Sequence, residues 1–442
     1  MLSACVGGTF SSPPGDAGTD GGGSIDAGVD GGSLFDAGGD AGSAVDAGTD
    51  AGLSFDAGTD AGTPPDAGAD AGTLPDAGGD AGPMSSLPRL PTGNHLGMVT
   101  TYEALPSGTR NALNTRVLDA IDAGMAVARL HLAWSELEPT AGTFDWAPLD
   151  DALEDAVPSN ASLLLLIETV DSEGFSLPAD LMNPNDRYGL AQGRQLDDAV
   201  ILARYDALID AVATRLAGKP VFAFSVANEP DNYLDDYPPS SAQGQAWLNA
   251  LEGFLTHARQ KIHAAMPGVA VGLTLTQRGL EQNFDLSGLI NKSDVAIFNY
   301  YCQSPDFFVD NLNLVPGELT QMLTAANGRP VILQELGCPA GPPAGTASLI
   351  GASEANQAAF FSAVFSRMQT EAHLRAAFVF TAVDWSPTLT TPYADALRNE
   401  GYPELADRFY ETLTTWGLLR YTDGSARPSW NAFLNGVETL RP

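Results

Sequence analysis

The sequence predicts an α/β fold, a (β/α)8 TIM barrel that follows a disordered low-complexity tether. Three observations lead to this prediction. From residue 95 onward, short apolar segments alternate with amphipathic ones, and eight such pairs fit one closed barrel. The apolar segments are nearly continuous, as in strands that are covered on both faces. The first 87 residues, by contrast, contain no Lys, Arg or Glu and almost nothing that could form a core.

The predicted tether consists of a ten-residue repeat, Asp-Ala-Gly-x-Asp-(Ala/Gly)-Gly with three variable residues, which runs from Asp16 to Gly82. Glycine and like-charged aspartate favour an extended, mobile coil. Gly/Asp repeats can also bind calcium in a β-helix, but that is a nonapeptide repeat with a fixed apolar position. We therefore expect residues 1–87 to be a flexible tether and residues 88–442 to be the barrel domain.

The chain starts with Met-Leu-Ser-Ala-Cys5, in which Leu-Ser-Ala-Cys resembles a bacterial lipobox, whose cysteine is lipidated after cleavage. The basic and apolar segments of a signal peptide are missing. Either the true start lies upstream or the match is coincidental, and a spacer directly after Cys5 favours the first alternative. We therefore expect a lipid anchor at Cys5 and a lipoprotein outside the cell or at its surface.

Acidic residues also dominate the barrel domain. The chain has a net charge of −34, and the 14 aspartates before residue 88 contribute −14, which leaves −20 for residues 88–442. This charge argues against nucleic acid as a partner, because phosphates need a basic surface, and against an anionic membrane or polymer.

No His/Cys cluster has the spacing of a metal site. Cys302 and Cys338 follow neighbouring predicted strands, and the sequence is compatible both with a disulfide between them and with two free thiols. We expect a monomer.

The eight predicted strands are short apolar runs. They lie at residues 97–102, 126–132, 162–168, 221–227, 269–275, 294–300, 330–335 and 377–383. Between them, apolar residues recur with a 3.6-residue period, which predicts helices around residues 113–121, 200–212, 247–262 and 361–368. An open doubly wound sheet is the alternative, but it would usually carry a glycine-rich phosphate loop after an early strand, and the sequence has none.

Two glutamates stand at strand ends, Glu229 just after the fourth strand and Glu335 at the end of the seventh. An ionised carboxylate is costly there unless it has a partner or a task. In a barrel all strands end at one mouth, where active sites collect, so both side chains should face the same space. Enzymes that cleave glycosidic bonds usually do so with two carboxyl groups held on a rigid scaffold. The predicted mouth also holds side chains that suit the faces and edges of a sugar: Tyr102, His131, Trp134, Asn228, Tyr300, Tyr301 and Trp385.

With these motifs the chain resembles glycoside hydrolase clan A, the retaining glycosidases on this barrel, with families 5 and 39 the most similar. Asn-Glu229-Pro matches the acid/base motif of the clan, and Glu335 matches the nucleophile. Arg129 resembles the arginine that supports the nucleophile in family 5, and Tyr301 keeps the position of the tyrosine that hydrogen-bonds it. Two departures are that Asn299 replaces the histidine of a His-x-Tyr motif, and that strand three lacks the histidine usual in family 5.

The resemblance implies hydrolysis of a β-linked oligo- or polysaccharide with retention of configuration. Glu335, kept ionised by Arg129 and Tyr301, would attack the anomeric carbon, while Glu229 would protonate the leaving oxygen and then activate water. The 2-hydroxyl would bind to Asn228, and the substrate-binding residues would be Arg129, Asn228, Tyr301, Trp385 and His131. No metal or organic cofactor is implied. A transglycosylase that uses the same residues is an alternative, as is a non-catalytic carbohydrate-binding barrel, although binding alone would not need both glutamates.

Overall fold

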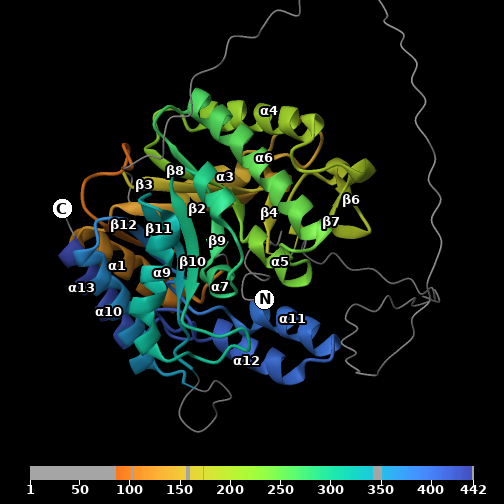
Figure 1. Ribbon diagram of the computed structural model, residues 1–442. Coiled ribbons are helices and arrows are strands. Elements are labelled where there is room, and N and C mark those ends of the chain that lie inside the picture. Colours follow the sequence, from red (N-terminus) through yellow and green to blue (C-terminus); the bar gives the residue numbers. More distant parts are fainter. Residues whose placement is uncertain (1–85, 101–102, 156–159, 173, 342–350, 441–442) are drawn as a thin grey trace, which may run out of the picture. The chain divides into compact units, whose positions relative to one another are not determined.

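The computed structural model describes residues 86–100, 103–155, 160–172, 174–341 and 351–440, whose arrangement Figure 1 shows. The predicted tether up to residue 85, with Cys5, lies outside the described residues, as does Tyr102. Eight parallel strands form one sheet in the order β1-β12-β11-β10-β9-β8-β3-β2. Because β1 also contacts β2, the two edges of the sheet meet, and the predicted (β/α)8 barrel is confirmed.

All eight predicted barrel strands are present. Their bounds are β1 (His95–Met98), β2 (Val127–Ala133), β3 (Ser162–Glu168), β8 (Val221–Asn228), β9 (Ala270–Thr276), β10 (Ala296–Tyr301), β11 (Val331–Gly337) and β12 (Leu374–Val379). The first and last strands begin two and three residues earlier than predicted, and both end four residues earlier. Apolar residues continue beyond Met98 and Val379 into buried loops, so that hydrophobicity alone does not mark these strand ends.

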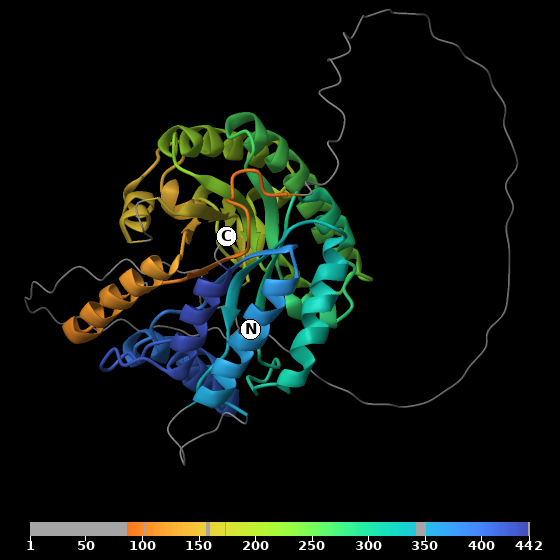
Figure 2. The same cartoon turned by 90° about the vertical axis from the view of Figure 1, so that its left-hand side faces the viewer.

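Helices surround the strands and cover the outside of the barrel, as the turned view in Figure 2 shows. The four helices predicted from the 3.6-residue period correspond to α1, α4, α6 and α10. The helices that follow the strands are α1 (Ser107–Ala123), α3 (Ala147–Asp155), α4 (Ala199–Arg215), α6 (Ala242–Ala265), α8 (Ser287–Lys292), α9 (Val315–Ala326), α10 (Glu354–Thr370) and α13 (Pro428–Leu440).

Further elements, most of them short, lie in the loops that follow the strands, and the sequence pattern did not predict them. An insertion between β3 and α4 contains β4 (Val170–Asp171), β5 (Gly174–Phe175), η1 (Ala179–Leu181), β6 (Met182–Asn183), β7 (Asp186–Leu190) and η2 (Ala191–Gly193). The remaining ones are α2 (Trp134–Leu137), η3 (Pro230–Asn232), α5 (Tyr233–Asp236), α7 (Gln277–Glu281), η4 (Leu312–Leu314), α11 (Pro387–Asn399) and α12 (Pro403–Leu413). Strands of two residues are too short to show a period.

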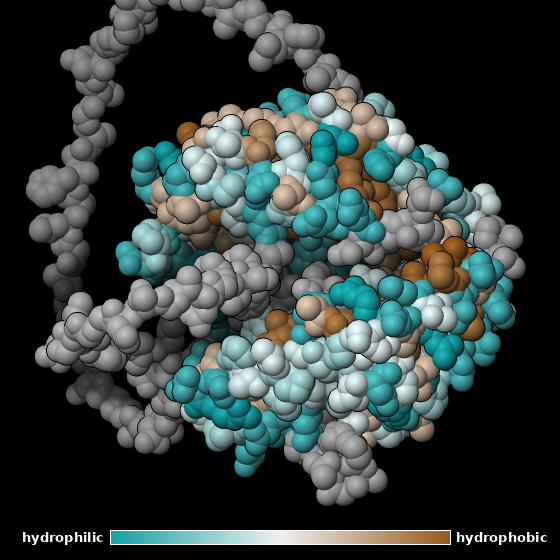
Figure 3. Space-filling model, turned by 180° about the vertical axis from the view of Figure 1, so that it is seen from behind, coloured by the Kyte–Doolittle hydropathy of each residue, from teal (hydrophilic) through white to brown (hydrophobic). Residues whose placement is uncertain are grey.

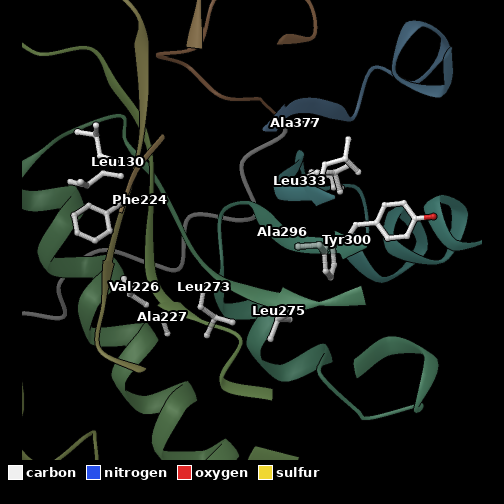
Figure 4. Close-up of a cluster of buried hydrophobic side chains, with 14 of the residues drawn as sticks. Leu130, Phe224, Val226, Ala227, Leu273, Leu275, Ala296, Tyr300, Leu333 and Ala377 are labelled. Atoms are coloured by element: carbon white, nitrogen blue, oxygen red, sulfur yellow. The ribbon is translucent and has the colours of Figure 1, made fainter. Parts of the chain in front are cut away.

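Side chains along each barrel strand alternate between the interior and the surrounding helices. The inward set includes Val127, Leu164, Ala223, Ile297 and Ile332. The outward set packs against the helices, and Figure 4 shows part of it: Leu130, Phe224, Leu273, Leu333 and Ala377. The interior is tightly filled, since a Cβ atom added at Gly97 would lie 2.7 Å from the Phe378 ring.

Residues 86–94 close the end of the barrel at which the strands begin. Leu87 and Leu90 are buried in the inward cluster, so that packing begins one residue before the predicted domain boundary. Arg89 donates a hydrogen bond to the carbonyl of Val221 at the start of β8 (3.4 Å). Arg375, at the start of β12, donates to the carbonyls of Pro91 and Gly93. The opposite end, where the strands finish, stays available for a site.

Hydrophilic residues cover most of the face shown in Figure 3, and hydrophobic ones form separate patches between them. This distribution agrees with the strongly acidic composition. Within the described ranges, no helix combines the length and the apolar character needed to cross a membrane.

Candidate active site

Strand alternation brings the candidate residues of two strands, β2 and β10, into the barrel. Arg129 and His131 follow Val127 at even spacing on β2, so they share its inward face. On β10, Asn299 and Tyr301 share the inward face of Ile297 in the same way. All four side chains therefore lie at or near the strand ends, on the inner wall of one mouth.

The two glutamates reach the same mouth through irregularities in the sheet. On β8 the pairing with β9 shifts between Ser225 and Asn228, just before Glu229. On the β10–β11 ladder the register shifts so that Asn299 pairs with Glu335. Such shifts re-aim side chains, and they are common beside active sites.

Glu335 is fully buried and has two strong donors. Arg129 Nη2 donates to Oε1 (2.8 Å), and the Tyr301 hydroxyl donates to Oε2 (2.5 Å). Burial raises the pKa of Glu335 above its ordinary value, Arg129 opposes the rise, and the nearby charge of Glu229 adds to it. The net direction is upward, which differs from the expectation that Arg129 and Tyr301 keep Glu335 ionised. Glu335 is therefore fully ionised only at a higher pH than an exposed glutamate.

Glu229 has neutral hydrogen-bond donors and a left-handed backbone (φ 49°, ψ 43°). Asn299 Nδ2 donates to its Oε1 (2.6 Å), while Asn232 Nδ2 (3.0 Å) and Ser172 Oγ (3.3 Å) donate to its Oε2. A left-handed conformation costs a non-glycine residue about 1–2 kcal/mol. Strain of this kind is concentrated at functional sites, where the surrounding structure holds it in place.

Asn228 is fully buried within a network of polar side chains. Its Nδ2 donates to Asp171 Oδ1 (2.9 Å), and its Oδ1 accepts from Gln334 (3.0 Å) and Asn299 (3.2 Å). Gln334 in turn accepts from Thr274 (2.7 Å). The amide of Asn228 thus has one fixed orientation, with Nδ2 toward Asp171 and Oδ1 toward the interior of the barrel.

His131 lies between Arg129 and Glu168. Arg129 Nη2 lies 3.0 Å from His131 Nδ1, and His131 Nε2 lies 2.6 Å from Glu168 Oε2. An arginine can only donate, so Nδ1 accepts and the proton of a neutral ring sits on Nε2, where it is donated to Glu168. Burial, followed by the charge of Arg129, lowers the pKa of His131 to about 4, which agrees with a neutral ring.

Two further carboxyls, Asp171 and Asp231, lie beside this group. Burial raises the pKa of Asp171 well above its usual range, and the charge of Glu168 adds to the rise. Asp231 accepts hydrogen bonds from the backbone and hydroxyl of Thr276, yet burial raises its pKa to about 7. These strongly perturbed carboxyls support the assignment of the mouth as a functional site.

A pocket opens beside Glu229. Its lining consists of Glu229, Asn232, Thr276, Gln277, Arg278, Asn299, Tyr301, Gln303, Ser304 and Pro305. Both Tyr301, the donor to Glu335, and Asn299, the donor to Glu229, contribute to its wall. A ligand in this pocket would contact the two hydrogen-bond donors and one of the carboxylates directly.

Three of the predicted mouth aromatics have other positions. Tyr300 points outward, and its hydroxyl donates to Glu318 of α9. Trp134 is buried at the start of α2 and donates to Glu138 (2.8 Å). Trp385 lies six residues beyond β12 and is 3% exposed, and its ring packs against Phe380, Tyr393 and Trp416. Trp416 stacks on Tyr301 (6.3 Å), so Trp385 lies one layer behind the site wall.

A disulfide joins Cys302 and Cys338, which resolves the alternative left open by the sequence. Cys302 directly follows Tyr301, and Cys338 follows the end of β11, three residues after Glu335. The bridge thus links the two strand ends that carry the hydrogen bond between Tyr301 and Glu335.

Several residues of the site were not among the predicted ones. Asn299 was noted only as a departure from a histidine, although it is a donor to Glu229. The position of Asn299 two residues before Tyr301 could have revealed this role, because both must share one face. Ser172 and Asn232 gave no signal, since they lie in loops whose course follows from tertiary packing.

Within the described residues, no group of three or more His, Cys, Asp or Glu side chains could hold a metal ion. The described side chains of the mouth offer carboxylates, amides, one imidazole, one guanidinium and one phenol.

No protein-family model and no curated protein matches the chain, but solved structures do. A GH5_18 protein from Bifidobacterium longum subsp. longum, in complex with Manβ1-4GlcNAc, matches with TM-score 0.53 and 16% identity over 79% of this chain and 78% of its own. Exo-β-1,4-mannosidase Op5Man5 from Opitutaceae bacterium strain TAV5 matches with TM-score 0.53 and 16% identity, over 79% of this chain and 60% of its own. β-Glycosidase BGL167 matches with TM-score 0.52 and 14% identity, over 80% of this chain and 98% of its own. The chain thus has the barrel fold of glycoside hydrolase clan A structures, as its motifs indicated.

Proposed function

We propose that this chain is a retaining β-glycosidase with Glu335 as the nucleophile and Glu229 as the acid/base. One observation carries the proposal: Asn299 and Tyr301, two residues apart on the same face of β10, donate to Glu229 and to Glu335 respectively. Two such positions on a strand are about 7 Å apart. The two carboxylates are therefore held close together by neighbouring positions of one rigid element, as a double displacement requires.

The environments of the two carboxylates suit their proposed roles. Glu335 accepts from a guanidinium and a phenol, so its carboxylate is oriented for attack on an anomeric carbon. Glu229 is surrounded by amide and hydroxyl donors and faces the pocket, where it can give a proton to a leaving oxygen and later take one from water. The bond to the leaving oxygen breaks as the bond to Glu335 forms, and water then releases the sugar with its original configuration.

The substrate class is a β-linked sugar. Two of the structurally similar proteins concern β-mannosides, one in complex with Manβ1-4GlcNAc and one named an exo-β-1,4-mannosidase. β-Mannosides are therefore the first compounds to assay, followed by β-glucosides, β-xylosides and β-galactosides.

The test is an assay of the full chain on aryl β-glycosides, with the anomer of the first product read by NMR. We expect turnover and a β-product, with Glu335→Gln lowering kcat/KM and Glu229→Gln lowering kcat, each at least about 10³-fold. Glu404→Gln, at a side chain 92% exposed on α12, is the matched control and should keep full activity. An α-product, or wild-type rates in both active-site variants, would refute the proposal.

We further propose that the enzyme acts as a monomeric lipoprotein outside the cell. The support is the Leu-Ser-Ala-Cys5 sequence and the Gly/Asp repeat that follows it. Mass spectrometry of the N-terminal peptide from producing cells should show an acylated Cys5, and light scattering of the soluble domain should give the mass of one chain. An unmodified Met1 terminus on the mature protein would contradict the anchor.

A further inference from the structure

A second pocket, of about 660 Å³, lies between the β5–β7 insertion and the N-terminal part of α6. Pockets that bind small organic ligands have volumes of about 300–1,000 Å³. The sequence pattern predicted neither this insertion nor the pocket, and the proposed mechanism uses neither. Its wall contains four aromatic residues, Phe175, Tyr188, Tyr233 and Trp247.

The four rings form one connected cluster. Tyr233 stacks on Trp247 with 4.5 Å between ring centroids, Tyr188 meets Tyr233 edge-on at 4.8 Å, and Phe175 lies 5.5 Å from Trp247. Phe175, Tyr188 and Tyr233 are only partly buried, so part of each ring faces the pocket. Tyr233 also stacks on Tyr237 at 4.7 Å. Because neighbouring rings hold one another in place, a ligand that contacts their apolar surface orders few further side chains.

Polar side chains complete the wall. Gln195, after η2, and Gln243, on α6, are both exposed and line the pocket from its two sides. Asp186 adds a carboxylate. A wall of aromatic rings and amides fits a ligand with apolar faces and a rim of hydroxyl groups, which is the chemistry of a sugar ring.

Direct hydrogen bonds connect this pocket to the proposed acid/base. Trp247 Nε1 donates to the carbonyl of Pro230, the residue after Glu229 (2.8 Å). On the other wall, the Tyr188 hydroxyl donates to the carbonyl of Ser172 (2.6 Å), and Ser172 Oγ donates to Glu229 (3.3 Å). The aromatic wall is thus one residue away from the proposed site of cleavage on both routes.

We propose that this pocket binds additional sugar units of the carbohydrate chain that is cleaved at Glu229. The inference rests on the proposed function and adds a substrate class, β-linked oligosaccharides longer than the two sugars joined by the cleaved bond. The aromatic rings bind the faces of these sugars, while Gln195, Gln243 and Asp186 bind their hydroxyl groups. The enzyme then selects for chain length as well as for linkage.

The experiment compares chain lengths in wild type and in a variant whose pocket is filled. Ala246 is exposed on α6 and lines the pocket, so Ala246→Trp introduces an indole there. The substrates are β-1,4-linked manno-, gluco- and xylo-oligosaccharides of two to six sugars, with p-nitrophenyl glycosides of the single sugars as short references. We expect kcat/KM of the wild type to rise with length, and Ala246→Trp to lower it about tenfold for the longest chains, in proportion to the loss of one or two stacking contacts. The aryl glycoside rates should stay within about twofold.

Ala264→Trp is the matched control. Ala264 is exposed on the same helix, 18 residues later, which is five turns along the same face and about 27 Å away. It carries the same added indole and should behave like wild type on all substrates. A second pocket variant, Tyr233→Ala, removes a ring instead of adding one and should show the same selective loss, with thermal melting used to check its fold.

Three outcomes decide the inference. Rates that do not depend on chain length, or an Ala246→Trp variant that cleaves the longest chains as well as wild type does, would overturn it. An equal loss on aryl glycosides and long chains would also overturn it, because the pocket would then only support Glu229. If wild type cleaves none of the substrates, the proposed function fails. The binding site can then be tested by itself, by electrophoresis in gels that contain the polysaccharides. Retardation of wild type but not of Ala246→Trp would establish it.

Discussion

Arg129 and Glu335 form an ion pair that is buried on both sides, with 2.8 Å between Nη2 and Oε1 and side chains that are 1% and 0% exposed. The same Nη2 lies 3.0 Å from His131 Nδ1, so that a neutral ring also helps to orient the guanidinium. The charge of Arg129 offsets part of the rise in the pKa of Glu335 that burial causes.

Replacing this arginine should change the pH profile as well as the rate. In Arg129→Met the carboxyl of Glu335 loses its cation, its pKa rises further, and a larger fraction is protonated and unable to attack. We expect kcat/KM to fall about 10²-fold or more near neutral pH, and the acidic limb of its pH profile to move to higher pH. Arg215→Met, at an exposed ion pair with Asp150, is the control. An unchanged acidic limb would show that Arg129 does not act on Glu335.

Azide should separate the roles of the two glutamates. In Glu229→Ala, an aryl glycoside with a good leaving group still transfers its sugar to Glu335, but water is not activated for the second step. A small anion can attack the intermediate directly, so azide should restore turnover and give the β-glycosyl azide, since two inversions retain configuration. Product stereochemistry by NMR is the measurement. Rescue of Glu335→Ala to an α-azide, without rescue of Glu229→Ala, would keep Glu335 as the nucleophile and contradict the acid/base role of Glu229.

The disulfide should stabilise the barrel and hold the site together. It closes a loop over a sequence separation of 36 residues, which in the chain-entropy description contributes about 4 kcal/mol to the free energy of unfolding. We expect the double variant Cys302→Ala/Cys338→Ala to unfold at a lower urea concentration and to lose part of its kcat, because Tyr301 and Glu335 are no longer linked. Dithiothreitol should have the same effect on wild type and none on the double variant. Equal urea midpoints for the two proteins would contradict this prediction.

Asp231 should make stability depend on pH. Its pKa is about 7 in the folded protein and close to 3.8 in the unfolded chain, so the folded state binds more protons between these values. The free energy of unfolding should therefore fall as pH rises from about 4 to 7, by at most about 4 kcal/mol from this one group. Other groups add their own slopes, so the measurement is the difference between wild type and Asp231→Asn in urea unfolding at pH 4.5 and pH 7.5. A difference that does not change with pH would refute the assignment.

The order of the strands and the alternation of side chains along each strand made the barrel and much of its mouth predictable from sequence. Glu229 and Glu335 were found because a polar residue at the end of an apolar run is conspicuous, whereas Arg129 was found through its resemblance to the arginine of family 5. The period of two would also have excluded Tyr300, since its neighbour Tyr301 points inward. Trp385 could not be placed in this way, because it lies beyond β12 in a loop whose course depends on packing against Trp416.

The hydrogen-bond partners within the candidate site could not be predicted from the sequence either. Hydrogen bonds such as those of Asn232 and Ser172 to Glu229 join residues 3 and 57 positions apart, and only one of these separations is local. The register shifts in β8 and β11 leave no mark in composition, although they decide which side chains of each strand end face the mouth. Sequence patterns therefore predicted the strands that carry the site, while its contacts depend on how those strands are offset.

The segment 86–94 and the candidate active site lie at opposite ends of the barrel. Arg89 and Pro91 contact the first residues of strands, whereas Glu229 and Glu335 stand at the far ends of strands. Substitutions in residues 86–94 should therefore change how tightly this end of the barrel is closed, and with it the stability of the domain, without a direct contact with the side chains of the mouth.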